Sequence, residues 1–268
     1  SGGSFSRVWD SGEDSDACFW RAVPVAKQIL ENEIAAANTP AAFEPSLDYV
    51  VAKLPRFPFD KFSTAANTLG TQMKATGEVM GIGSTLEECL LKSVRSLEIG
   101  AQHLWLPKFQ NMTKAELTEY LRQFRDDGLF AVAQLLRLGA SVDEVAALTM
   151  ITPFFLETIR TIVNMEQTLC THKGDGETLK QAKQMGFCDP YIARLWGVRE
   201  EDVYAQRVQL GLYPAYKMVD TSHTGAYIPY FYSTYAPGAK SEARRSDKKK
   251  VVVLGAGPIR IGQGIEFD

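Results

Sequence analysis

The sequence predicts a mainly α-helical chain that carries α/β segments at both ends. Residues 113–212 have apolar residues at helical spacing, with capping residues and glycines between the periodic stretches. Two short segments rich in β-formers precede them, at 47–57 and 76–83. A continuous apolar run opens at Val251, which is typical of a strand buried in a parallel sheet.

Composition indicates an ordinary folded chain. Of the 268 residues, 45% are hydrophobic and 23% are charged, which argues against a disordered chain. The net charge of −3 argues against nucleic-acid binding through bulk positive charge. No apolar run is long enough to span a bilayer, and the polar, acidic N-terminus shows no secretory signal. We therefore expect neither a membrane nor a nucleic-acid partner.

Cysteine and histidine spacing predicts neither disulfides nor a metal site. No two cysteines form a CxxC pair, so reduced thiols are expected. The histidines lie too far apart for a recognised ligand spacing, so each is expected at the surface or as a satisfied side chain. These residues are Cys18, Cys89, Cys170, Cys188, His103, His172 and His223.

The first hundred residues predict two helices and two strands. Val25, Ile29 and Ile34 suggest a helix that ends at 38–40. In the segment 47–57, Pro55 predicts either the end of a strand or a sheet edge, as does the following Pro58. Ser84 and Glu87 match a capping box for a helix over 84–97. The apolar face of that helix is predicted to hold Leu86, Leu90, Val94 and Leu97.

A weak internal repeat lies within the helical region. Residues 138–159 superpose on 185–206 at an offset of 47, with each copy predicted to be a short helix, a turn and a second helix. Thr113 and Glu116 form a second capping box, at the start of a helix that continues through Leu117, Leu121 and Phe124. Five glycines are expected as helix ends or turns, namely Gly128, Gly139, Gly186, Gly197 and Gly211.

Beyond this region the sequence predicts an extended aromatic segment, a charged linker and a glycine-rich turn. Residues 238–250 are polar, basic and without apolar period, as in a linker. The strand opening at Val251 precedes Gly255, Gly257 and Gly262, which are candidates for a nucleotide-binding loop. Their spacing does not fit GxGxxG. The remaining residues cannot supply a sheet around that strand, so we expect it to begin another domain.

The repeated units allow an alternative function, a helix-turn-helix module that binds DNA. Such units also occur as plain structural bundles. In the second unit, Glu200, Glu201 and Asp202 stand at the start of the second helix, where acids would repel phosphates.

Six blocks of this sequence together resemble the large subunit of carbamoyl phosphate synthetase. The resemblance covers residues 24–268. The blocks are 43–57, 71–83, 148–159, 183–198, 216–221 with 229–235, and 251–268.

The resemblance implies three domains. Residues 1–98 would be the C-terminal tail of the first ATP-grasp synthetase unit, with 1–23 divergent. Residues 99–246 would be the helical oligomerisation domain with its linker, and 247–268 would begin the second synthetase unit. The chain would then be a fragment of the parent subunit that links the two halves and mediates oligomerisation.

The resemblance also implies a function for the parent. It would make carbamoyl phosphate from bicarbonate, ammonia and two ATP, with Mg²⁺ or Mn²⁺ and K⁺, for arginine and pyrimidine synthesis. Its partners would be further copies and a glutaminase subunit or domain, in the cytoplasm or, in a eukaryote, in mitochondria. Independently of the resemblance, the helical region predicts self-association through an apolar face with aliphatic residues such as Leu135, Leu136 and Leu138, although each of these leucines fits a place in the core equally well.

Departures from the family pattern imply that this chain is inactive alone. The acid–x–Asn–x–Arg metal segment of the first half is missing before 22–27, although Arg7 matches its last position, so no catalytic or metal-binding residue is assigned. No bound cofactor is expected in this chain. Gly264 and Glu266 match positions that line the family's internal tunnel.

Overall fold

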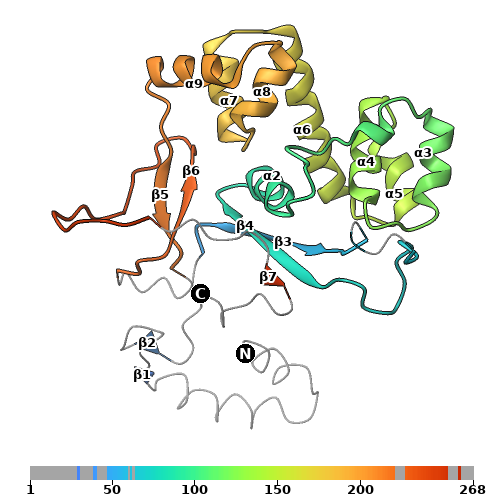
Figure 1. The fold of residues 1–268 in the computed structure, drawn as a ribbon, viewed down its shortest axis with the longest axis horizontal. Helices are drawn as coiled ribbons and strands as arrows, with labels where there is room; N and C mark the ends of the chain where they lie inside the picture. Colours follow the sequence, from blue (N-terminus) through green and yellow to red (C-terminus); the bar gives the residue numbers. More distant parts are fainter. Residues whose placement is uncertain are drawn as a thin grey trace, which may run out of the picture. The chain divides into compact units, whose positions relative to one another are not determined.

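The computed structural model describes residues 29–30, 39–40, 47–59, 61, 64–220, 227–252 and 259–260. The chain divides into two compact units. One comprises residues 1–48 and 218–230, and the other comprises residues 49–217 and 231–268. The described part is mainly helical with a few short strands, which confirms the predicted mainly helical class (Figure 1).

In the smaller unit, a two-residue ladder replaces the predicted first helix. Strand β1 (Ile29–Leu30) pairs antiparallel with β2 (Thr39–Pro40), with Ile29 opposite Pro40. The helical prediction is wrong at these residues. The spacings of four and five between the apolar residues make an uneven stripe, which tertiary pairing can override. Val25 and Ile34 lie outside the described residues.

The larger unit contains a sheet of three strands in the order β3-β4-β7. Strand β3 (Val50–Arg56) runs antiparallel to β4 (Gly77–Gly83), and β7 (Ile259–Arg260) pairs antiparallel with the start of β4. Both predicted strands are confirmed, and β3 lies at the sheet edge, as Pro55 predicted.

The strand predicted to open at Val251 is not formed at the two residues that the structure describes there. Val251 and Val252 are 90% and 80% exposed and belong to no strand. The nearest described strand downstream is β7, and its pairing is antiparallel. Among the described strands none runs parallel beside Val251. The loop candidates Gly255, Gly257, Gly262, Gly264 and Glu266 lie outside the described residues.

Helix α2 (Leu86–Ser96) packs on the sheet, against β3 and β4. It begins one residue later than predicted, because Thr85 rather than Ser84 accepts a hydrogen bond from the backbone N–H of Glu88. The close approach depends on Gly81, where an added Cβ would lie 2.3 Å from the carbonyl oxygen of Cys89. Leu91 and Val94 are buried on this helix, whereas Leu86 and Leu90 are half-buried.

The helical body follows α2 and accounts for most of the larger unit. Helix α6 contacts α2, α4, α5, α7 and α8, and so lies between the two halves of the body (Figure 1). Its elements are η1 (Pro107–Phe109), α3 (Lys114–Leu121), α4 (Gly128–Arg137), α5 (Val142–Thr149), α6 (Pro153–Thr171), α7 (Gly176–Gln184), α8 (Asp189–Trp196) and α9 (Glu200–Gln209). The capping box of Thr113 and Glu116 is present at the start of α3.

The predicted repeat is confirmed and extends to a third helix. Helices α5 and α8 begin 47 positions apart, at Val142 and Asp189, and α6 and α9 begin at the same offset. The helices that precede them, α4 and α7, end at Arg137 and Gln184, again at that offset. Two copies of one three-helix unit, α4–α6 and α7–α9, therefore form this body.

Four of the five predicted helix-end glycines have positive φ, namely Gly139, Gly186, Gly197 and Gly211. Gly128 instead begins α4.

The core of the body contradicts the predicted role of two leucines. Leu135 and Leu136 are only 4% and 6% exposed and belong to the apolar cluster between the helices. Leu138, by contrast, is 38% exposed. Two of the three aliphatics expected to mediate self-association are therefore core residues. None of the helices described for this chain is both long and apolar enough to cross a membrane.

The last strands are β5 (Ala215–Met218) and β6 (Phe231–Thr234), which pair with each other. The described residues after β6, up to Val252, form no helix or strand, in agreement with the predicted linker.

Candidate functional site

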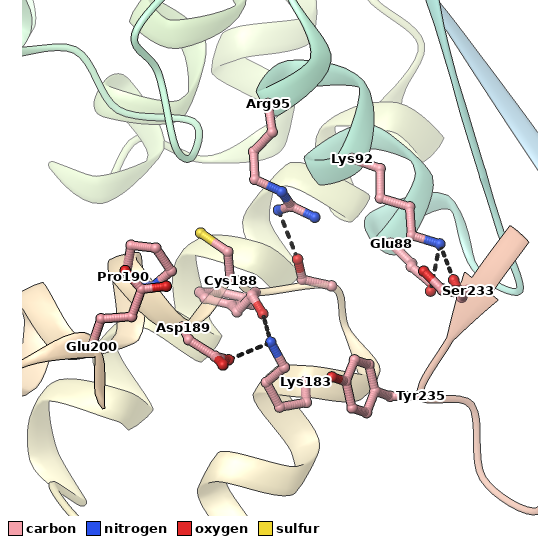
Figure 2. Close-up of a pocket in the computed structure, with 12 residues that line it drawn as sticks. Glu88, Lys92, Arg95, Lys183, Cys188, Asp189, Pro190, Glu200, Ser233 and Tyr235 are labelled. Carbon is pink, nitrogen blue, oxygen red and sulfur yellow. Dashed lines mark hydrogen bonds and ion pairs between the residues drawn. The ribbon is translucent and has the colours of Figure 1, made fainter. Parts of the chain in front are cut away.

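A cavity of about 230 Å³ lies between α2, the α7–α8 turn and β6 (Figure 2). Charged and aromatic side chains from all three segments line it. Its lining includes Glu88, Lys92, Arg95, Lys183, Asp189 and Tyr235.

Helix α2 directs three charged side chains toward this cavity. Glu88, Lys92 and Arg95 are four and three residues apart, so they share one face of the helix. The Thr85 cap sets where the helix begins and therefore where this face points.

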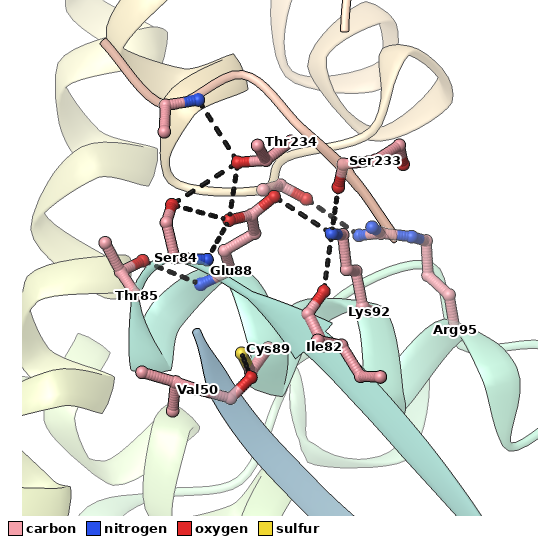
Figure 3. Close-up of polar contacts among 12 residues, drawn as sticks. Val50, Ile82, Ser84, Thr85, Glu88, Cys89, Lys92, Arg95, Ser233 and Thr234 are labelled. Carbon is pink, nitrogen blue, oxygen red and sulfur yellow. Dashed lines mark hydrogen bonds and ion pairs between the residues drawn. The ribbon is translucent and has the colours of Figure 1, made fainter. Parts of the chain in front are cut away.

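Glu88 is buried and fully engaged (Figure 3). Its Oε2 accepts hydrogen bonds from the Ser84 backbone N–H at 2.8 Å and from the Thr234 hydroxyl at 3.0 Å. Its Oε1 lies 2.9 Å from the ammonium group of Lys92, which also donates to the carbonyl oxygens of Ile82 and Ser233. This carboxylate therefore joins α2 to β6.

Lys183 and Arg207 share Asp189 on the opposite wall. The ammonium group of Lys183 lies 2.6 Å from Asp189 Oδ1 and donates to the carbonyl oxygen of Phe187 at 2.8 Å. Burial lowers the pKa of Lys183, and Asp189 opposes that effect. Arg207 lies 3.1 Å from Asp189 Oδ2 and donates to the Tyr235 hydroxyl at 2.9 Å. These bonds join α7, α8 and α9 to the segment after β6.

Arg95 completes the connection across the cavity. Its guanidinium donates to the carbonyl oxygen of Gly186 at 2.9 Å, and burial lowers its pKa (Figure 2). At Gly186, with φ of 95°, an added Cβ would lie 2.8 Å from Cα of Glu88. The α7–α8 turn is therefore held directly against α2.

A second polar cluster lies inside the helical body. Glu166 on α6 forms a bidentate pair with Arg137, at 2.6 and 2.7 Å, and accepts a hydrogen bond from the Tyr191 hydroxyl at 2.8 Å. Burial alone would raise the pKa of Glu166, but the hydrogen bonds and charge of Arg137, with a smaller effect of His103, lower it to about 2.

His103 is buried beside this pair. Its Nε2 lies 2.8 Å from Glu166 Oε1, but the ring stacks on Tyr191 and neither ring nitrogen has a well-oriented hydrogen-bond partner. Burial lowers the pKa of His103; the Glu166 carboxylate opposes this effect, and the charge of Arg137 adds to it. Because Arg137 already neutralises Glu166, a second cation there would be unfavourable, and we assign the neutral imidazole.

Neither cluster has the arrangement of a catalytic nucleophile with its base. Burial raises the pKa of Cys89 to about 11, so its thiol stays protonated and donates to the carbonyl oxygen of Val50. Cys89, Cys170 and Cys188 are free, as predicted, and Cys18 lies outside the described residues. In the described ranges, no three His, Cys, Asp or Glu side chains come together to hold a metal ion.

Sequence reasoning missed both clusters. Charged residues at helical spacing resemble a solvated face, and most of the partners lie far apart in the chain. One signal was present for Glu166, which is flanked by Ile162, Val163 and Leu169 on the apolar face of α6. A lone acid within such a face indicates a buried partner. His103 is buried, whereas His172 is exposed.

The fold and its two buried clusters define a helical repeat domain in which charged side chains hold elements together. A family model, described as carbamoyl-phosphate synthetase large chain, oligomerisation domain, matches residues 78–211, half of the chain. The chain belongs to this family. The match runs from β4 to the end of α9, and so includes α2 and both three-helix units.

Proposed function

We propose that this chain serves as the self-associating and linking part of a carbamoyl-phosphate synthetase large chain. The observation that carries the proposal is the coincidence of the family match with the helical body. The matched residues contain both copies of the repeat and most of the apolar core.

In this proposal the parent is an ATP-dependent ligase that makes carbamoyl phosphate, with ATP, Mg²⁺ or Mn²⁺ and K⁺ serving its synthetase halves. A glutaminase subunit or domain would supply ammonia. Residues 1–98 and 247–268 would belong to the two halves, on either side of the helical domain and its linker. The charges around the cavity support a mechanical role, since they bind α2, the α7–α8 turn and β6 into one piece.

The helix-turn-helix alternative gains little from the structure. The described α8–α9 unit has the expected helix–turn–helix order, but Glu200, Glu201 and Asp202 occupy the first turn of α9. Negative charge at that end of a helix favours cations and repels phosphate.

Self-association is tested by sedimentation velocity on the 268-residue chain over a wide concentration range. We expect the weight-average mass to rise from monomer to a closed oligomer, a symmetric dimer being the commonest solution. A strict monomer at the highest concentration would contradict the proposal.

The assignment of the chemistry to the synthetase halves, and not to this chain, is tested by an activity assay. With ATP, bicarbonate and ammonia, the chain should release no phosphate above background, because we assign the chemistry to the synthetase halves. Sustained turnover would contradict this assignment.

A further inference from the structure

The α5–α6 turn, together with the first turn of α6, presents three large apolar side chains to solvent. Met150, Phe154 and Phe155 are 85%, 64% and 50% exposed. The two phenylalanine rings contact each other edge to face, with centroids 5.4 Å apart. Neighbouring exposed aromatic side chains on a folded domain are typical of an interaction surface.

The repeat shows that the fold does not require these residues. At the offset of 47, the corresponding positions in the second copy are Gly197 at the end of α8 and Glu201 and Asp202 in the first turn of α9. Both turns follow helices of matching bounds, α5 and α8, and both precede helices that start at the same offset, α6 and α9, yet these three positions carry no large apolar side chain in the second copy. The apolar side chains of the first turn therefore serve something other than formation of the turn.

The backbone at Met150 supports the same conclusion. Met150 has φ of 61°, a left-handed conformation that favours glycine, and the second turn has Gly197 there with φ of 73°. A methionine at this position is strained, and its side chain contributes almost nothing to the core. Strain retained at an exposed apolar residue points to a functional contact.

We propose that Met150, Phe154 and Phe155 form the surface through which one copy of this chain binds a second copy. This inference rests on the proposed function, because the family match to an oligomerisation domain is what favours a second copy as the occupant. On α6, directly after the aromatic pair, Glu157 and Arg160 form an exposed ion pair. A surface that carries both charges is self-complementary, as a two-fold interface requires.

The test replaces the three exposed apolar residues of the first copy with the residues at the matching positions of the second copy. The variant is Met150→Gly, Phe154→Glu, Phe155→Asp. It should fold, because it removes the left-handed methionine and places acids in the first turn of α6, where the helix dipole favours them. The control is Tyr213→Glu, which replaces an aromatic residue that is 61% exposed outside this surface.

Sedimentation velocity on the full chain should show self-association weakened about 100-fold or more in the triple variant, since buried aromatic anchors carry most of the energy of an interface. Tyr213→Glu should associate like wild type. Far-UV circular dichroism and the urea midpoint report whether each variant is folded. An oligomeric wild type with a folded triple variant of unchanged affinity overturns this surface and leaves the proposed function intact. A monomeric wild type overturns both.

Discussion

Replacing Glu166 by glutamine should lower the free energy of unfolding of the helical body by about 3 kcal/mol. Glu166 is 6% exposed and forms two short contacts with the Arg137 guanidinium. The glutamine keeps the size of the side chain and one carbonyl oxygen for the Tyr191 hydroxyl. It removes the charge, and its amide N–H groups cannot accept from Arg137.

Two arguments give the same magnitude. Breaking a buried ion pair by removing one partner costs about 3–5 kcal/mol, and the retained carbonyl places this change near the lower end. Independently, a pKa of about 2 for Glu166, against an ordinary 4.5, corresponds to about 3 kcal/mol in favour of the ionised form. Both arguments attribute most of the effect to Arg137, with a smaller share from His103 in the pKa.

Urea unfolding at pH 7, followed by circular dichroism, measures the change. The matched control is Glu177→Gln on α7, where the carboxylate is 75% exposed and lies 3.5 Å from Lys180. An exposed pair is worth at most about 1 kcal/mol. Equal midpoints for the two variants, with unchanged dependence on urea, would refute the reasoning, since burial would then have no influence on the pair.

Two further predictions concern the α7–α8 turn and the buried histidine. Gly186→Ala should destabilise the chain by several kcal/mol, because its Cβ would meet the backbone of Glu88. The control Gly197→Ala, in open space at a similar φ, should cost about 1 kcal/mol. Similar urea midpoints for the two variants would contradict the close packing at Gly186. The free energy of unfolding should also fall as the pH drops below about 6.5, because His103 binds a proton in the unfolded chain but not in the folded one. It should fall again below about 4.5, where Glu166 binds a proton in the unfolded chain first. In His103→Phe the urea midpoint should change less between pH 7.5 and 5.5 than in wild type, whereas the exposed-site control His172→Gln should keep the wild-type change. A wild-type midpoint that rises on acidification would exclude a neutral buried imidazole.

Local features of this chain could be predicted without its coordinates. The offset of 47, the Thr113 capping box and the strands at 50–56 and 77–83 all depend on residues close in sequence. Capping, helical period and strand propensity act over a few positions, so the order of residues carries them directly. The family resemblance extended that reading to the domain class.

Other features required the packed chain. A carboxylate at residue 88 or 166 looks like any solvated helix acid until Thr234, Arg137 and Tyr191 close around it, at separations of 146, 29 and 25 residues. The Thr85 cap and the antiparallel pairing at β7 likewise depend on which neighbour reaches a given backbone group.

The sequence alone therefore determined the mainly helical class, the two-copy repeat and the glycine turns at Gly139, Gly186, Gly197 and Gly211. Tertiary structure alone decided which charges are buried, which leucines fill the core, and that Met150, Phe154 and Phe155 are exposed. The physical reason is range: propensity and capping are local, whereas burial and charge pairing depend on segments that only the folded chain brings together.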